Sequence, residues 1–211
     1  RLKILEAAQK LNYTPNMVGR MLKKNESLDI GVIIPTISNP FYTQLILGIE
    51  TEALKHGYNI LLCNSFRDSK MEKNYLESLY QKQVKGIIIS SIGLNHDLLN
   101  EMKSNGVSVV AFDQSIDNVK CSKVGFDFTK GGLLATEYLI GLGHNRIAFL
   151  TSPITRKSRQ DILDGYKMAL LKNNILYDET LVIVSECEEE FENATYEFEN
   201  GKQLAKKFLE I

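Results

Sequence analysis

Short runs of aliphatic and β-branched residues alternate with amphipathic stretches along most of the chain. Runs that are apolar on both faces, as in buried parallel strands, lie at 30–35, 59–63, 86–90, 107–112 and 146–151. Stretches with helical periodicity lie at 40–56, 70–83, 95–104 and 129–142. Repeated strand–helix units with short loops are typical of a doubly wound α/β sheet. The sequence therefore predicts a parallel sheet with helices on both faces.

The pattern continues only briefly beyond Thr151-Ser-Pro153. A helix is predicted at 158–173, a strand at 181–185 and a helix at 193–209. One strand with two helices cannot cover both faces of a sheet, so we interpret residues 153–211 as an incomplete second lobe of a truncated or partial chain.

Composition excludes several classes of protein. The chain has 211 residues, of which 44% are hydrophobic and 24% charged, as in ordinary globular proteins. No apolar run approaches the roughly 20 residues that cross a bilayer, and the first residues lack the apolar core of a signal peptide. Cys63, Cys121 and Cys187 are far apart and lack metal-ligand spacing. We therefore expect a cytoplasmic protein with reduced thiols, no membrane partner, no metal and no cofactor.

Charge is distributed unevenly along the chain. Residues 1–24 carry six basic residues against one acid, whereas residues 178–199 carry nine acids and neither Lys nor Arg. A basic end on an otherwise acidic protein indicates an anionic partner for that end. A solvated charged face explains the same pattern equally well.

Polar residues follow the predicted strands at their carboxyl ends, where open α/β sheets bind ligands. They are Asn39, Asn64, Ser90 and Asp113, and Asp127 precedes another predicted helix at the same edge. Asp113 and Asp127 are candidates for a pair of catalytic carboxylates, but no third catalytic residue at a recognisable spacing supports acid–base catalysis. A phosphate-binding glycine loop, a GxSxG elbow and an HExxH helix are also lacking, so the sequence does not predict an enzyme.

The segment Ser38-Asn39-Pro40-Phe41-Tyr42 follows the first predicted strand. Ser38 or Asn39 can cap the next helix, with Pro40 at its first position. We expect Phe41 to begin a core-facing stripe, and the other ring to lie over a cleft. An aromatic face beside amide, hydroxyl and carboxylate groups fits a small polyhydroxylated ligand. Packing of both rings in the core is the structural alternative.

Several segments together resemble the LacI/GalR family of bacterial transcription regulators. They are residues 11–16 (LNYTPN), 18–22 (VGRML), 30–42 (IGVIIPTISNPFY), 57–64 (GYNILLCN), 84–89 (VKGIII) and 143–148 (GHNRIA). The resemblance implies a two-lobed effector domain shaped like a periplasmic binding protein. By this resemblance, residues 1–13 are the last helix of an incomplete helix-turn-helix headpiece, and 14–28 the hinge helix and linker. Residues 29–152 are then the N-terminal lobe and 153–211 part of the C-terminal lobe.

The resemblance also implies a function. It predicts a homodimeric, sequence-specific DNA-binding regulator, a repressor of carbohydrate metabolism, that binds operator DNA and responds to a sugar, sugar phosphate or sugar acid between its lobes. The implied DNA contacts are Asn16, Val18, Arg20, Met21 and Leu22. The expected effector contacts are Asn39, Phe41, Tyr42, Asn64, Ser90, Asp113, Asp127, Phe128, Arg156 and Arg159.

One departure from the family pattern leaves the class of effector open. The family usually has an effector-binding Arg three residues before the Gly-Tyr seen here at 165–166, where this chain has Ile162. Arg156 and Arg159 are nearby substitutes. A sugar-binding protein of a transport system, without DNA binding, is the alternative function, and the sequence upstream of Arg1 distinguishes the two.

Overall fold

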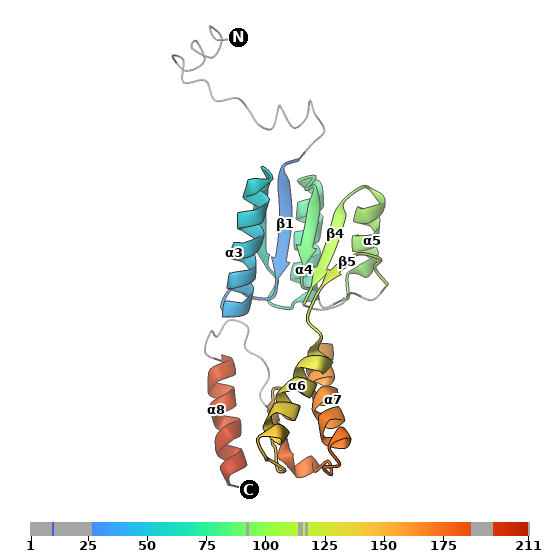
Figure 1. Cartoon of the computed structure of the whole chain (residues 1–211). Helices are drawn as coiled ribbons and strands as arrows, with labels where there is room; N and C mark the ends of the chain where they lie inside the picture. The colour runs from blue at the N-terminus through green and yellow to red at the C-terminus, as the bar shows by residue number, and fades with distance from the viewer. Residues whose placement is uncertain are drawn as a thin grey trace.

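A computed structural model of the chain describes residues 10, 27–91, 93–113, 116, 118–186 and 196–210. They form a five-stranded sheet with its helices and a smaller unit around a two-stranded sheet (Figure 1). The predicted headpiece helix, apart from Lys10, and the predicted hinge helix lie outside the described residues.

All neighbouring strands of the larger sheet are parallel, in the order β2-β1-β3-β4-β5. The strands are β1 (Asp29–Ile34), β2 (Asn59–Asn64), β3 (Gly86–Ile89), β4 (Ser108–Phe112) and β5 (Ser122–Val124). Four of them match the predicted runs, whereas β5 was not predicted. This edge strand has three exposed residues, so it shows no apolar run.

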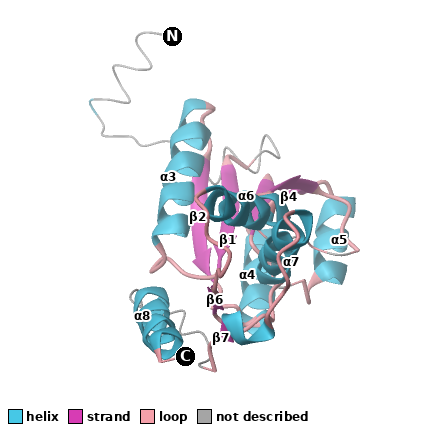
Figure 2. Cartoon of the chain, turned by 60° about the horizontal axis from the view of Figure 1, so that its bottom comes forward, coloured by secondary structure: helices cyan, strands magenta, loops and turns pink. Residues whose placement is uncertain are grey.

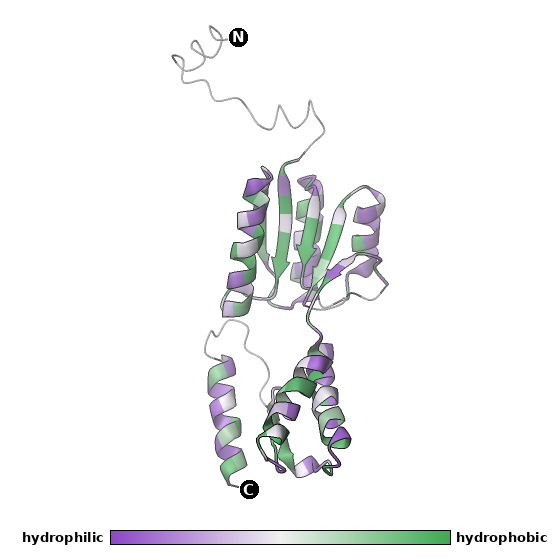
Figure 3. Cartoon of the chain, in the orientation of Figure 1, coloured by the Kyte–Doolittle hydropathy of each residue, from purple (hydrophilic) through white to green (hydrophobic). Residues whose placement is uncertain are grey.

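Helices cover both faces of this sheet, as predicted. They are α3 (Pro40–Lys55), α4 (Ser69–Gln81) and α5 (His96–Ser104). Side chains alternate along β1, so Val32 and Ile34 pack on the α3 side while Ile33 packs against Leu76 and Leu79 of α4. Hydrophobic residues accordingly dominate the strands, and hydrophilic residues appear on the helices (Figure 3).

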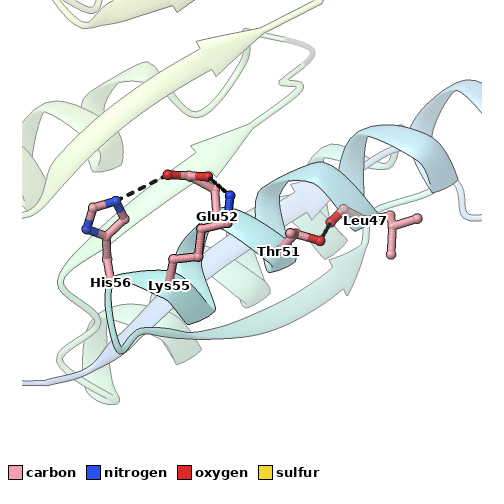
Figure 4. Close-up of polar contacts among 5 residues, drawn as sticks. All are labelled: Leu47, Thr51, Glu52, Lys55 and His56. Atoms are coloured by element: carbon pink, nitrogen blue, oxygen red, sulfur yellow. Dashed lines mark hydrogen bonds and ion pairs between the residues drawn. The ribbon is translucent and has the colours of Figure 1, made fainter.

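Charged side chains interact with one another on the exposed surface at the C-terminal end of α3 (Figure 4). Glu52 accepts hydrogen bonds from Lys55 Nζ at 2.9 Å and lies 3.2 Å from His56 Nε2. These two hydrogen bonds hold the pKa of the Glu52 carboxyl below its usual value. Leu47 and Leu54 on the same helix are exposed.

No helix in the described ranges is long and apolar enough to cross a membrane.

The smaller unit contains α6 (Phe128–Gly141), β6 (Phe149–Thr151), α7 (Lys157–Lys172), a 3-10 turn (Glu179–Leu181), β7 (Val182–Val184) and α8 (Tyr196–Leu209). Strand β6 pairs in parallel with β7, and α6 packs beside α7 (Figure 2). The predicted boundary at residue 152 is therefore corrected: the division of the sheets falls between β5 and α6. An apolar run such as 146–151 identifies a strand but does not reveal which sheet the strand joins.

Helices α6 and α7 cross at two glycines. A Cβ atom on Gly132 would lie 2.2 Å from the carbonyl oxygen of Ile162, and one on Gly165 would lie 2.0 Å from that of Thr129. Both obstructing atoms belong to the backbone, so rotation of a side chain cannot relieve the contact. The two helices can approach this closely only because both positions lack a side chain.

Candidate functional site

The segment Ser38-Asn39-Pro40 starts α3 as predicted. Asn39 is the N-cap, and its side-chain oxygen Oδ1 accepts a hydrogen bond from the backbone N–H of Phe41 at 2.9 Å. Pro40 occupies the first helical position. The Asn39 oxygen therefore stabilises the helix start, and this capping role accounts for the residue without a ligand.

The two rings that follow have the opposite roles to those expected. Tyr42 is only 5% exposed and packs with Val32, Ile34 and Phe112, whereas Phe41 is 38% exposed. The prediction that Phe41 begins the core-facing stripe is therefore wrong. The packed positions of α3 are 42, 45, 46 and 49, and this helical spacing places residue 41 beside the core.

Asp113, directly after β4, holds the hydroxyl of Tyr42. Tyr42 donates a hydrogen bond to Asp113 Oδ2 at 2.8 Å, and Ser90 Oγ lies 3.5 Å from the same oxygen. Burial, together with the Asp113 carboxylate, raises the pKa of Tyr42 to about 12. The phenol therefore stays protonated and donates to Asp113 at physiological pH. Asp113 itself has a left-handed backbone, with φ of 61°.

We expect Tyr42→Phe to lower the free energy of unfolding by about 1.5–3 kcal/mol, since it deletes a hydrogen bond to a charged group but keeps the ring. Because the pKa of Tyr42 is higher in the folded protein than in the unfolded one, its contribution to stability is complete below the unfolded pKa of about 10. This stability is lost as the pH rises through about 12. Urea unfolding should show a smaller difference in the free energy of unfolding between the wild type and Tyr42→Phe at about pH 11 than at about pH 8. Tyr138→Phe, at a ring 69% exposed, is the control; an equal change in both variants would contradict the assignment.

Three phenylalanines, Phe41, Phe126 and Phe128, form an aromatic row at this edge of the sheet. The ring centroids of Phe41 and Phe126 are 6.0 Å apart, as are those of Phe126 and Phe128. Phe126, which the sequence reasoning missed, is 65% exposed. The signal for Phe126 in the sequence was an aromatic residue two positions before Phe128.

A hollow of about 200 Å³ opens beside this row. Its lining comes from both units and consists of Ala111, Asp113, Lys123, Val124, Gly125, Phe126, Phe128, Lys157, Ser158 and Asp161. The volume is below the roughly 300–1,000 Å³ of typical small-molecule sites, so the hollow fits a small polar ligand or part of a larger one. Asp113 and Phe128 are the two predicted residues that line it.

The other predicted residues are dispersed around this edge. Within the described part of the chain, Asn64 Oδ1 at the end of β2 is buried and has no hydrogen-bond partner. Asp127 is exposed, and its Oδ1 caps α6 by accepting from Lys130 N at 2.9 Å. Arg156 is the N-cap residue of α7, and Arg159 donates from Nη1 to the Pro153 carbonyl at 2.9 Å. The five predicted DNA contacts lie outside the described residues.

The loop after β3, which carries Ser90, is fixed by a buried carboxylate. Glu72 of α4 is only 1% exposed. Its Oε1 accepts from Ser91 Oγ at 2.9 Å and from Asn95 Nδ2 at 2.8 Å. Glu72 therefore links the start of α4 to the loop that presents Ser90 to Asp113.

Residues 27–198 match a family profile described as periplasmic binding proteins and the sugar-binding domain of the LacI family. The chain belongs to the LacI family. The resemblance and the two-lobed α/β fold predicted from the sequence are thus confirmed, with a LacI-family effector domain as the matched region.

Curated relatives of this LacI-family chain are named as transcription regulators. It is 30% identical over 187 residues to the repressor PurR of Aliivibrio fischeri, covering 88% of this chain and 56% of the relative. It is 34% identical over 182 residues to catabolite control protein A of Staphylococcus xylosus, covering 86% and 55%. The chain thus spans about half the length of these relatives. They are regulators rather than enzymes, in agreement with the sequence reasoning.

Solved structures of LacI-family proteins have the same fold. The regulator CcpA of Lactococcus lactis aligns with a TM-score of 0.71 at 28% identity, covering 88% of this chain and 65% of that chain. A periplasmic binding protein/LacI regulator of Alkaliphilus metalliredigens, solved in complex with D-xylulofuranose, aligns with a TM-score of 0.65 at 29% identity. That alignment covers 78% of this chain and 59% of the other.

Proposed function

We propose that the protein is a homodimeric transcription regulator that binds operator DNA and is controlled by a small sugar-like effector. The effector would lie at the carboxyl ends of the strands, between the two units. Membership of the LacI family and the regulator relatives support this proposal.

The observation that carries the proposal is the position of the Asp113 carboxylate beside the aromatic row. Tyr42 and Ser90 orient Asp113, and Phe126 and Phe128 line the same hollow. A carboxylate accepts hydrogen bonds from sugar hydroxyls, while exposed rings stack on the C–H face of a sugar. A sugar in the complex of the Alkaliphilus relative is consistent with this chemistry.

Control of DNA binding would follow from a shift between arrangements of the two lobes. An effector that binds one arrangement more tightly increases its population, and this changes the spacing of the two hinge segments in a dimer. Asn16, Val18, Arg20, Met21 and Leu22 would contact DNA from these segments. By family resemblance, Leu22 would insert into the minor groove and kink the duplex.

A thermal-shift screen of the protein expressed from its complete coding sequence tests this function. We expect a sugar, sugar phosphate or sugar acid to stabilise it, by about 2.7 kcal/mol at 100 times the dissociation constant, and to change its affinity for operator DNA. Asp113→Ala should weaken effector binding about tenfold or more, because a charged hydrogen bond is lost. Asp97→Ala, at a side chain 96% exposed, is the control. Lack of any response across the three ligand classes would contradict the proposal.

The alternative, a sugar-binding protein of a transport system, predicts a different upstream sequence. A helix-turn-helix before Arg1 favours the regulator, and a signal peptide favours the transport protein. The regulator relatives, 30% and 34% identical, favour the first.

A further inference from the structure

Two Asn-Gly dipeptides, Asn105-Gly106 and Asn200-Gly201, lie in contrasting surroundings. In an Asn-Gly pair the backbone nitrogen of the glycine can attack the asparagine side chain, because glycine is flexible and has no side chain that obstructs the approach. Asn105 is exposed and caps the C-terminal end of α5, whereas Asn200 lies inside α8 and is only 7% exposed. The same dipeptide therefore has different freedom to react in the two places.

The turn after α5 requires the glycine that follows Asn105. Gly106 has a left-handed backbone with φ of 91°, and its N–H donates to the Lys103 carbonyl at 3.0 Å. The next N–H, that of Val107, donates to the Met102 carbonyl at 3.0 Å. These two bonds form the Schellman motif, which satisfies carbonyl groups at the end of a helix. The helix end thus keeps a reactive dipeptide on the surface.

The side-chain amide of Asn105 is only weakly held. Its Nδ2 donates to the Glu101 carbonyl at 3.0 Å, which also accepts from the Asn105 backbone N–H at 3.1 Å and from Ser104 Oγ at 2.7 Å. A carbonyl oxygen has two lone pairs, so these three donors compete. Asn105 also borders a hollow of about 480 Å³ at the amino-terminal edge of the larger sheet, where water reaches it.

Asn200 is held much more firmly. Its Nδ2 donates to Ser152 Oγ at 2.8 Å, which ties α8 to the loop after β6. Gly201 follows inside the helix rather than at its end. Rearrangement there requires α8 to open and a buried side chain to leave its partner, whereas a helix end such as that of α5 opens at a lower cost in free energy.

We propose that Asn105-Gly106 is a site of spontaneous deamidation, at which water converts residue 105 to aspartate or isoaspartate. Hydroxide removes the proton from Gly106 N, and this nitrogen attacks Cγ of Asn105. The new N–Cγ bond replaces the Cγ–Nδ2 bond, and Nδ2 takes up a proton from water and leaves as ammonia. Water then opens the cyclic imide at either carbonyl, which gives aspartate or isoaspartate.

The two products differ in their effect on the fold. Isoaspartate adds a methylene to the backbone just before Gly106, whereas aspartate keeps the backbone length. Val107 is 8% exposed, packs in the core with Val109 and also donates the Schellman bond to Met102. The longer backbone cannot hold both of these contacts in place. Isoaspartate should therefore destabilise the protein, and its formation adds a negative charge near the C-terminus of α5, where the helix dipole disfavours it.

Peptide mapping by mass spectrometry, after incubation of the complete protein in mildly alkaline buffer, tests the assignment. In the folded protein, Asn105 should deamidate about tenfold or more faster than Asn200, since local opening at a helix end is easier than opening of a helix interior. In urea the two rates should become similar. Raising the pH should speed the reaction at Asn105, because hydroxide starts it.

Asn105→Gln is the matched control, because the longer side chain closes the corresponding ring far more slowly. Its peptide should gain no mass, and after incubation this variant should melt at a higher temperature than wild type incubated in the same way. Deamidation of Asn105 no faster than that of Asn200 in the folded protein would overturn the inference. A difference between the two rates that persists unchanged in urea would also overturn it, because the fold would then not be its cause.

Discussion

Gly132→Ala is expected to lower the free energy of unfolding by about 3 kcal/mol or more. The added methyl group meets a neighbour that cannot move aside, and overpacking destabilises a protein most in that case. The added methyl group would lie 2.2 Å from the Ile162 carbonyl oxygen. Helices α6 and α7 would have to move apart, and their other contacts would loosen. Urea unfolding followed by circular dichroism measures the change.

The neighbouring residue supplies the control. A Cβ on Gly131 meets nothing within 4 Å in the described structure, although it lies on the same helix. Gly131→Ala should therefore stabilise the protein by about 0.5–1 kcal/mol, because alanine loses less conformational freedom on helix formation. Equal effects of the two substitutions would show that α6 and α7 do not cross at Gly132.

Glu72→Ala is expected to destabilise the protein by about 3 kcal/mol, since it removes the acceptor of one buried and one part-buried hydrogen bond. The donors of these bonds are the Ser91 hydroxyl and the Asn95 side-chain amide. The loop that carries Ser90 would lose its link to α4, so effector binding should weaken as well. Chemical unfolding and calorimetry report the two effects separately.

Two further substitutions on α4 check this interpretation. Glu72→Gln keeps an acceptor oxygen and should lose much less stability than Glu72→Ala. Glu77→Ala removes a carboxylate that is 47% exposed and should change the free energy of unfolding by less than about 0.5 kcal/mol. A Glu72→Ala protein as stable as Glu77→Ala would show that the buried carboxylate does not hold the loop.

The fold was largely predictable because its signals are local. β1 to β4 are apolar on both faces, and capping residues such as Asn39 and Asp68 mark where helices begin. The edge strand β5 has no such signal, since it is exposed and only three residues long. The assignment of 146–151 to the wrong sheet has a different cause: strand pairing depends on tertiary contacts that periodicity does not encode.

The candidate site was predictable only in part. Ser90 and Asp113 follow strands directly, so topology alone brought them together. The exchange of Phe41 and Tyr42 depended on a single helical position, about 100° of rotation, which lies within the uncertainty of a helix start. Phe126 lies between β5 and α6, outside any apolar pattern. Its nearness to Phe128 in the chain was a sequence signal, but its contact with Phe41 depends on the tertiary fold.

The left-handed backbone of Asp113 restricts which residues could replace it in the proposed effector site. Apart from glycine, the residues that adopt such a conformation most readily are asparagine and aspartate, whereas β-branched or bulky residues rarely do so. Only two replacements of Asp113 therefore fit the backbone easily. Asparagine exchanges one acceptor oxygen for a donor, and glycine removes the polar group from the proposed site. New preferences for larger or apolar ligands must instead arise at neighbouring positions with ordinary dihedral angles, such as Phe126 and Phe128.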